Sequence, residues 1–210
     1  MTPSAHVFEA IAEQRLLAIV RLDSEAAAVD ACRVLARGGL RAVEISLAQP
    51  GATTAIATAA NELAAVAFVG AGTVRTLAHA AAAVAAGAEF LVGPNLDEEI
   101  AAWARERDVL YLPGALTPTE VELASRRSPL VKLFPAGRLG PDYVSDLRAP
   151  YPDAALVPTG GVDLDNAAAF LEAGAAAVAL GSALVNARSA ADPARLEAAA
   201  QQALHITRRS

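Results

Sequence analysis

The chain has 210 residues, 54% of them hydrophobic, and a formal net charge of −6. This length suits one well-buried core, so we expect a single domain over residues 1–210 rather than two domains. The lack of a basic stripe argues against a nucleic-acid partner, and the acidic balance argues mainly for solubility. The single cysteine excludes an internal disulfide. The lack of a signal peptide or membrane-length apolar run predicts a cytoplasmic protein.

Helical and apolar stretches alternate along the whole chain. An N-terminal helix is predicted from near Ser4, with Val7, Phe8 and Ile11 on one face that could cover the bottom of a barrel. Apolar runs typical of buried parallel strands then recur at intervals of roughly 20 to 26 residues, the size of a minimal strand–helix unit. They are residues 16–22, 41–47, 67–73, 89–95, 109–115, 130–136, 154–160 and 176–182.

Eight strand–helix units predict an α/β fold, a single (β/α)₈ TIM barrel with an extra N-terminal helix. An open doubly wound sheet is the competing architecture, because strand order is invisible in sequence. The segment TPTE predicts a helix start with Thr117 and Glu120 as a capping box. Gly38, Gly87 and Gly174 follow predicted helices where a left-handed residue is needed.

Polar residues are few at the carboxyl ends of these strands, where a barrel carries its active site. They comprise one lysine, one carboxylate, one arginine, two threonines and two glycine-rich turns. The strand-end residues are Arg21, Glu44, Thr73, Pro94, Asn95, Pro113, Gly114, Lys132, Thr159, Gly160, Gly161, Gly181 and Ser182.

Lys132 is the most informative residue, because it is the only lysine in a chain with sixteen arginines. It lies inside the apolar run LVKLFP, where burial lowers an ammonium pKa and favours the neutral amine that can attack a ketone. Arginine cannot perform this chemistry. The alternative is a structural lysine paired with Glu44 or reaching the surface; its solitary position near the predicted barrel mouth favours the nucleophile.

Glu44 is the one carboxylate that lies inside an apolar run near its carboxyl end. A carboxylate there can transfer protons if its pKa lies near working pH. The alternative is a simple ion pair with Arg21 or Lys132, and the two interpretations are compatible.

The turns TGGV (159–162) and GSALV (181–185) follow the seventh and eighth strands, which often build the phosphate site of such barrels. Glycines allow backbone N–H groups to approach phosphate oxygens, and Ser182 adds a hydroxyl. Plain glycine turns are the alternative, but their occurrence after both strands favours phosphate binding.

Metal and cofactor sites find no support in the sequence. The three histidines, His6, His79 and His205, fall in helical stretches, away from the strand ends. We therefore predict no metal site, and no cofactor, because no glycine-rich dinucleotide fingerprint follows a strand.

The chain resembles the bacterial KDPG/KHG aldolases, the 2-dehydro-3-deoxy-phosphogluconate and 4-hydroxy-2-oxoglutarate aldolases. The matching segments follow the family order over nearly the whole chain. They are IVRL (19–22), VEISL (43–47), GAGTV (70–74), GPNLDEE (93–99), PGALTPTE (113–120), VKLFPAGRLGP (131–141), PTGGV (158–162) and LGSALV (180–185).

The resemblance implies a metal-free class I pyruvate aldolase, usually a homotrimer, with a small-molecule 2-keto-3-deoxy acid as its substrate. It implies that Lys132 forms the Schiff base and that Glu44 is the general acid/base, partly through a water. The other roles it implies concern substrate contacts. Thr73 and Pro94 hold the pyruvyl end, Phe134 packs beside the reacting centre, Thr159 touches the substrate chain, and Gly160, Gly161, Gly181 and Ser182 lie in the phosphate turns.

One departure concerns the substrate carboxylate. Many family members carry an arginine four residues beyond the glutamate, where this chain has Ala48, so we assign carboxylate binding to Arg21. The related 2-dehydro-3-deoxy-6-phosphogalactonate aldolases tend to have an apolar residue at the position of Thr159 and a proline at that of Ser46. Both positions here favour the gluconate substrate.

Two functions of other classes remain as alternatives. A sugar-phosphate isomerase or epimerase on the same barrel would share the phosphate turns but needs two acid/base groups. A phosphate-binding barrel without catalysis is the other, since one barrel hosts many functions.

Overall fold

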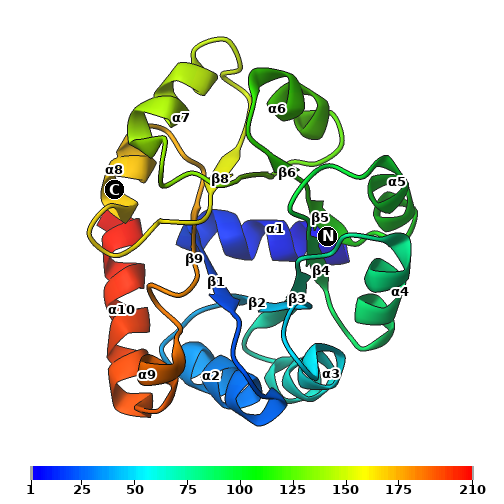
Figure 1. Cartoon of the computed structure of the whole chain (residues 1–210), viewed down its shortest axis with the longest axis vertical. Helices are drawn as coiled ribbons and strands as arrows, with labels where there is room; N and C mark the ends of the chain where they lie inside the picture. Colours follow the sequence, from blue (N-terminus) through cyan, green and yellow to red (C-terminus); the bar gives the residue numbers. More distant parts are fainter. Residues whose placement is uncertain (1, 210) are drawn as a thin grey trace.

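The computed structural model describes residues 2–209 and shows an α/β fold in which a curled parallel sheet is surrounded by helices (Figure 1). The elements in chain order are α1 (Pro3–Gln14), β1 (Leu16–Val20), α2 (Glu25–Arg37), β2 (Ala42–Ser46), α3 (Ala52–Leu63), β3 (Phe68–Gly72), α4 (Leu77–Ala85), β4 (Phe90–Val92), α5 (Glu98–Glu106), β5 (Leu110–Leu112), β6 (Gly114–Ala115), α6 (Pro118–Ser125), β7 (Val131–Leu133), α7 (Gly140–Arg148), β8 (Leu156–Pro158), α8 (Ala167–Glu172), β9 (Val178–Leu180), α9 (Ala187–Ala190) and α10 (Pro193–Arg209).

Each of the eight predicted apolar runs contains a strand, which confirms that part of the prediction. The run at residues 109–115 is divided into β5 and β6 at Pro113. Proline has no backbone N–H and therefore cannot donate a hydrogen bond to the neighbouring strand at that point.

The strands form two parallel sheets, one of six strands in the order β5-β4-β3-β2-β1-β9 and one of three in the order β6-β7-β8. An isolated parallel bridge between Thr159, directly after β8, and Ala179 in β9 connects them on one side. On the other side only Pro113 separates β5 from β6. The first strand pairs with the last, Leu17 opposite Ala179, which is not the order of a doubly wound sheet.

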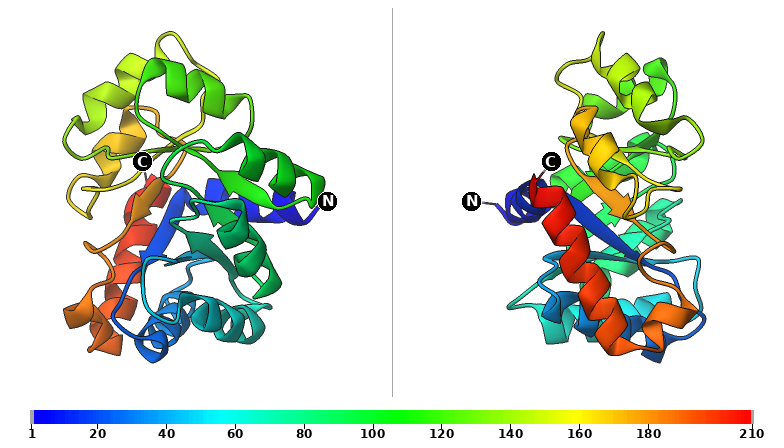
Figure 2. Two further views of the ribbon diagram at one scale, coloured as in Figure 1. Left: turned by 45° about the vertical axis from the view of Figure 1, so that its right-hand side comes forward. Right: turned by 90° about the vertical axis from the view of Figure 1, so that its left-hand side faces the viewer.

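Helix α1 closes one end of the curled sheet (Figure 2). It begins at Pro3, close to the predicted Ser4, and Val7 and Ile11 on its inner face are buried. They belong to an apolar cluster with strand residues such as Leu17, Phe90 and Leu112. The amino ends of the strands are thus covered, and the opposite, carboxyl ends remain open to solvent.

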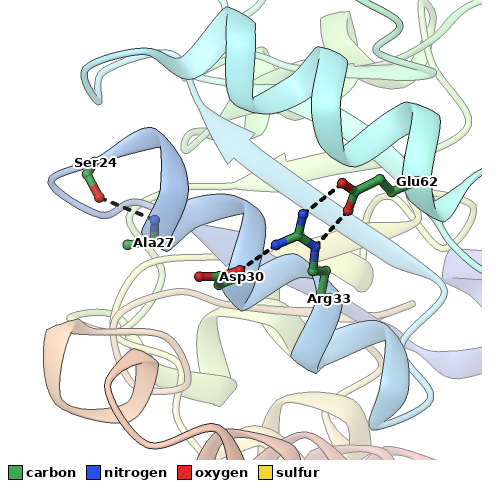
Figure 3. A network of polar contacts seen from close by, with 5 residues as sticks. All are labelled: Ser24, Ala27, Asp30, Arg33 and Glu62. Atoms are coloured by element: carbon green, nitrogen blue, oxygen red, sulfur yellow. Dashed lines mark hydrogen bonds and ion pairs between the residues drawn. The ribbon is translucent and has the colours of Figure 1, made fainter.

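A polar network joins α2 to α3 on the outside (Figure 3). The Ser24 side chain accepts a hydrogen bond from the Ala27 N–H at the start of α2. Arg33 forms ion pairs with Asp30 of the same helix at 2.5 Å and with Glu62 of α3 at 2.6 Å. These groups are solvent-exposed, so we assign them a role in orienting the two helices rather than a large stabilisation.

The predicted helix ends are confirmed with one exception. Thr117 and Glu120 form the capping box at the start of α6, and Gly87 and Gly174 have φ of 100° and 99°. The prediction for Gly38 is wrong: its φ is −67°, and Gly39 adopts the left-handed conformation, with φ 98°. Gly38 is small for another reason, because a Cβ there would lie 2.8 Å from the Cβ of Ala200 on α10.

None of the helices between residues 2 and 209 is both long enough and apolar enough to span a membrane. The single cysteine, Cys32, is buried in α2.

Candidate active site

A cavity of about 700 Å³ lies at the carboxyl ends of the strands. It is lined by all eleven residues to which the sequence analysis assigns a role, from strands far apart in the chain. They are Arg21, Glu44, Thr73, Pro94, Lys132, Phe134, Thr159, Gly160, Gly161, Gly181 and Ser182. The other strand-end residues, Asn95, Pro113 and Gly114, do not line it.

Lys132 is held in the middle of the three-stranded sheet. Its Cα pairs with Gly114 of β6 on one side and with Val157 of β8 on the other. The residue is 7% exposed, and its Nζ lies 5.2 Å from the centroid of the Phe134 ring. Within the described residues its amine has no hydrogen bond or ion pair. The alternative of a structural ion pair with Glu44 is therefore wrong, and the amine is available to a ligand.

Glu44 lies on β2, between β1 and β3, and is 1% exposed. Its Oε2 is buried and has no hydrogen-bond partner among residues 2–209. Burial raises the pKa of this carboxyl above its ordinary value of 4.5, and the nearby positive charge of Lys132 opposes part of that increase. A buried carboxyl with a raised pKa can both accept and return a proton.

Thr73 follows β3 and has a φ of 59°. A β-branched residue in the left-handed region is a genuine outlier, and such backbone strain clusters at functional sites. Its hydroxyl is 3.0 Å from that of Ser46 at the end of β2. The backbone N–H of Thr73 donates to no acceptor in the structure as described, so the residue offers two polar groups near Glu44.

The two glycine turns lie beside each other, since Thr159 and Ala179 form a parallel bridge. Gly160 and Gly161 have φ of 81° and 80°, a conformation that L side chains rarely adopt. Across residues 2–209, no acceptor is bonded to the backbone N–H groups of Gly161 and Ser182. Free N–H groups in adjacent turns can bind an anion.

Three more predicted residues have structural surroundings that limit what they can do. Thr159 is buried, and its hydroxyl donates to the Val157 carbonyl at 3.0 Å. Phe134 is 39% exposed beside Lys132, an unusually open position for a large aromatic side chain. Gly181 has an ordinary φ, and a Cβ there would meet only the Cβ of Ile19 at 3.9 Å, so its size is not required by the fold.

Sequence reasoning missed several polar residues of the cavity. Arg75, Asp23, Asp163 and Asn186 also line it. They lie in loops beyond the strand ends, outside the apolar runs that identified the other positions. The signal that could have found Arg75 is its place two residues after Thr73 in the same turn.

Among residues 2–209, no group of three or more His, Cys, Asp or Glu side chains is placed to hold a metal ion. His6, His79 and His205 lie on α1, α4 and α10, as predicted. The cavity brings together a buried amine, a buried carboxyl and, within the described residues, the unbonded N–H groups of Gly161 and Ser182.

Comparison with known proteins adds an independent observation. The family model described as KDPG and KHG aldolase matches residues 7–199. The 2-dehydro-3-deoxy-phosphogluconate aldolase of Treponema pallidum is 37% identical over 95% of this chain and 97% of its own length. The 2-dehydro-3-deoxy-6-phosphogalactonate aldolase of Escherichia coli is 33% identical over 77% of this chain and 80% of its own.

A solved structure agrees with this. The 2-keto-3-deoxy-6-phosphogluconate aldolase of Zymomonas mobilis superposes with a TM-score of 0.84 at 27% identity, covering 94% of this chain and 95% of the other.

Proposed function

The chain belongs to the KDPG and KHG aldolase family, and on that premise we propose that it is a class I aldolase cleaving 2-dehydro-3-deoxy-6-phosphogluconate to pyruvate and glyceraldehyde 3-phosphate. One observation carries the proposal. The chain's only lysine is buried and lines one cavity together with a buried carboxyl, and in the part of the chain that the structure describes neither group has an ion-pair partner.

Lys132 begins the reaction. Its neutral Nζ attacks the C2 ketone of the substrate, and the resulting carbinolamine loses water to give a protonated imine, the iminium. Low solvent access supports this chemistry, because it protects the iminium from premature hydrolysis. The positive iminium nitrogen then withdraws electrons from the adjacent bonds.

Glu44 moves the proton. As a carboxylate it removes the proton of the C4 hydroxyl, directly or through a water. The C3–C4 bond breaks, its electron pair moves toward the iminium nitrogen, and glyceraldehyde 3-phosphate leaves. The remaining enamine is protonated at C3, and hydrolysis of the iminium releases pyruvate and restores the amine. The iminium is the electron sink throughout, so the proposed cycle is metal-independent and uses no cofactor.

The remaining residues bind the two ends of the substrate. Thr73 and Pro94 contact the pyruvyl end, and Phe134 packs beside the reacting carbon. Thr159 touches the substrate chain. The phosphate lies in the turns of Gly160, Gly161, Gly181 and Ser182, a role supported by the free N–H groups of Gly161 and Ser182.

We extend the proposal to the whole protein. The two sheets are parts of one closed (β/α)₈ barrel with α1 as an extra helix, supported by the pairing of β1 with β9 and the Thr159–Ala179 bridge. Residues 1–210 are one domain. The protein is a cytoplasmic homotrimer, which sedimentation equilibrium of the purified protein tests. Oligomerisation, though not its order, is supported by a similar structure, a cage designed by fusing symmetric oligomeric domains.

The preferred substrate is proposed from two residues. Ser46 shares a hydrogen bond with Thr73, and Thr159 is a polar residue in the lining of the cavity. Both positions favour the gluconate-derived acid over the galactonate-derived acid as the substrate. Activity on 4-hydroxy-2-oxoglutarate, giving pyruvate and glyoxylate, is a secondary expectation. An isomerase is not favoured, because Glu44 is the only buried carboxyl among the described residues of the cavity.

The test is a comparison of kcat/KM for the gluconate-derived, galactonate-derived and unphosphorylated substrates, with pyruvate release as the readout. The proposal predicts the highest value for the gluconate-derived acid. Pyruvate release from none of the three contradicts the aldolase, whereas a preference for the galactonate-derived acid contradicts only the substrate assignment.

A further inference from the structure

Each glycine turn of the cavity carries two consecutive backbone N–H groups without a partner. In the turn after β8 they belong to Gly161 and Val162, and in the turn after β9 to Ser182 and Ala183. Within residues 2–209 none of these N–H groups has an acceptor, and all four residues line the cavity. Consecutive free N–H groups can form a concave site for an anion. The direction in which they point therefore decides how well each turn binds one.

The direction of each N–H group is set by the carbonyl of the same peptide unit. In a trans peptide the C=O and the N–H point in opposite directions, and the peptide units of both turns are trans. A hydrogen bond that holds the carbonyl on one side therefore turns the N–H to the other side.

Backbone groups hold the first carbonyl of each turn. The Gly160 carbonyl accepts a hydrogen bond from the Gly137 N–H at 2.7 Å. The Gly181 carbonyl accepts from the N–H groups of Leu184 and Val185 at 2.9 and 2.8 Å. The first free N–H of each turn is thus oriented by main-chain contacts alone.

An asparagine holds the second carbonyl of each turn. The Asn166 Nδ2 donates to the Gly161 carbonyl at 3.0 Å, and the Asn186 Nδ2 donates to the Ser182 carbonyl at 2.8 Å. Neither carbonyl has another partner in the part of the chain that the structure describes. The second free N–H of each turn therefore depends on one side-chain amide.

Both amides are fixed through their oxygen atoms. The Asn166 Oδ1 accepts from the Asp163 N–H at 2.9 Å. The Asn186 Oδ1 accepts from the N–H groups of Arg188 and Ser189 at 3.0 and 3.1 Å, at the start of α9. An aspartate could accept the same bonds, but it could not donate to the carbonyl of the turn. The arrangement therefore requires an amide at both positions.

The carboxylate of Asp163, which lines the cavity beside the first turn, belongs to the same arrangement. Its Oδ1 accepts from the backbone N–H groups of Asp165 and Asn166 at 3.0 Å each. Asp163 and Asn166 are thus bonded to each other in both directions, which holds the Asn166 amide against the turn.

We propose that Asn166 and Asn186 are positioning residues, which orient the N–H groups of Val162 and Ala183 toward the phosphate of the substrate. The inference rests on the proposed aldolase function and adds to it two side chains that act through the main chain. Without these amides, the second peptide unit of each turn can rotate and turn its carbonyl oxygen toward the ligand. A carbonyl oxygen repels an anion, so binding of the phosphate would weaken.

The test compares glyceraldehyde 3-phosphate with glyceraldehyde as the aldehyde that condenses with pyruvate. The two aldehydes differ only in the phosphate, so the ratio of their kcat/KM values measures what the phosphate site contributes. The variants are Asn166→Ser, Asn186→Ser and their combination. Serine can replace asparagine as the N-cap of α9, but it lacks the amide that reaches the turn.

Asn95→Ser is the matched control. The Asn95 Nδ2 also donates to a backbone carbonyl, that of Leu96 at 2.8 Å, but Asn95 does not line the cavity. Its replacement removes a bond of the same kind without affecting either glycine turn.

Each single variant should lower kcat/KM with glyceraldehyde 3-phosphate by about 3- to 10-fold, the effect of one hydrogen bond. The combination should lower it by about 10- to 100-fold, because each substitution acts on a different turn. The kcat/KM with glyceraldehyde should not change, nor should the pyruvate concentration that gives half-maximal borohydride trapping on Lys132. Asn95→Ser should leave the ratio of the two kcat/KM values unchanged.

An equal loss with both aldehydes would overturn the inference, because it would indicate general damage to the site. An unchanged kcat/KM with glyceraldehyde 3-phosphate in the combined variant would also overturn it, and both results would leave the aldolase intact. Failure of pyruvate to modify the unaltered protein is a different result, because it would refute the proposed function itself.

Discussion

Gly72 of β3 lies directly against the side chain of Glu44 on β2. A Cβ added at Gly72 would overlap the carboxyl group of Glu44, whereas a Cβ at Gly70, two residues earlier on the same strand, would overlap the ring of Phe90. Only glycine at position 72 leaves room for the buried carboxyl. The two glycines therefore make a matched pair, one beside the proposed acid/base group and one beside an apolar ring.

Replacing Gly72 by alanine should displace Glu44 and reduce kcat by about 10²-fold, since small misplacements of catalytic groups have effects of that size. Both Gly72→Ala and Gly70→Ala should reduce the free energy of unfolding by about 1 to 3 kcal/mol, because each overpacks the interior. Gly70→Ala should do so with little change in kcat. Thermal unfolding and cleavage rates of both variants check this. Equal rate losses in the two would contradict a specific effect on Glu44.

Glu44→Gln keeps the side chain's shape but removes its ability to take up a proton. We expect kcat for cleavage to fall by about 10² to 10⁴-fold, the usual contribution of a general base. Steady-state cleavage of the phosphorylated substrate is the measurement. A variant with unaltered kcat would exclude Glu44 from the mechanism.

The raised pKa of Glu44 has a consequence for stability. Burial makes the folded state hold this proton more tightly than the unfolded chain does, despite the opposing charge of Lys132. The stabilisation from the protonated carboxyl is fully present below about pH 4.5, the ordinary value, and is lost as pH rises through the higher folded pKa.

Glu44→Gln removes this dependence, because its amide does not ionise. The Tm of the variant should therefore increase relative to that of the unaltered protein between pH 4.5 and neutral pH. Below that window the difference in Tm should be constant. Thermal unfolding of both proteins over this range is the measurement. If the Tm of the variant falls relative to that of the unaltered protein as pH rises, the expected direction of the effect is contradicted.

The glycine turn after β8 has its own matched pair. Gly161 has φ 80°, and a Cβ there would lie 2.9 Å from the Cα of Gly137; Gly140 has φ 76° with nothing within 4 Å of its Cβ position. Alanine at either position costs about 1 to 2 kcal/mol for the left-handed backbone, but only Gly161 lines the cavity.

Gly161→Ala should raise KM for the phosphorylated substrate by at least about 10-fold, because the displaced backbone N–H loses its hydrogen bond to the charged phosphate. Borohydride trapping of the pyruvate adduct should change little. Gly140→Ala should leave both unchanged. If Gly161→Ala impairs pyruvate trapping as strongly as it impairs KM, the turn is not a phosphate site alone.

Much of the fold and site was predictable because the signals were local. The apolar runs identified the strands, and the rule that catalytic residues follow barrel strands selected Lys132 and Glu44, which do line one cavity. The division of the fifth apolar run into β5 and β6 also has a local cause, because Pro113 has no backbone N–H and is visible in the sequence.

The remaining features depend on distances that no sequence pattern contains. Lys132 and Glu44 form no ion pair among the described residues, and sequence cannot show this, because their strands, β7 and β2, belong to different sheets. The role of Gly38 follows from Ala200, far along the chain. Arg75 was missed because an exposed loop arginine has no periodic signature.

Trapping of the covalent intermediate tests the central claim most directly. The protein is incubated with pyruvate and borohydride, and the modified residue is located by peptide mass mapping. Because Lys132 is the only lysine, the N-terminal amine is the only other primary amine that could react. The account predicts one stable adduct on Lys132, absent in Lys132→Ala and Lys132→Arg, both of which lose cleavage. An adduct confined to the N-terminus, or substantial cleavage by either variant, would contradict it.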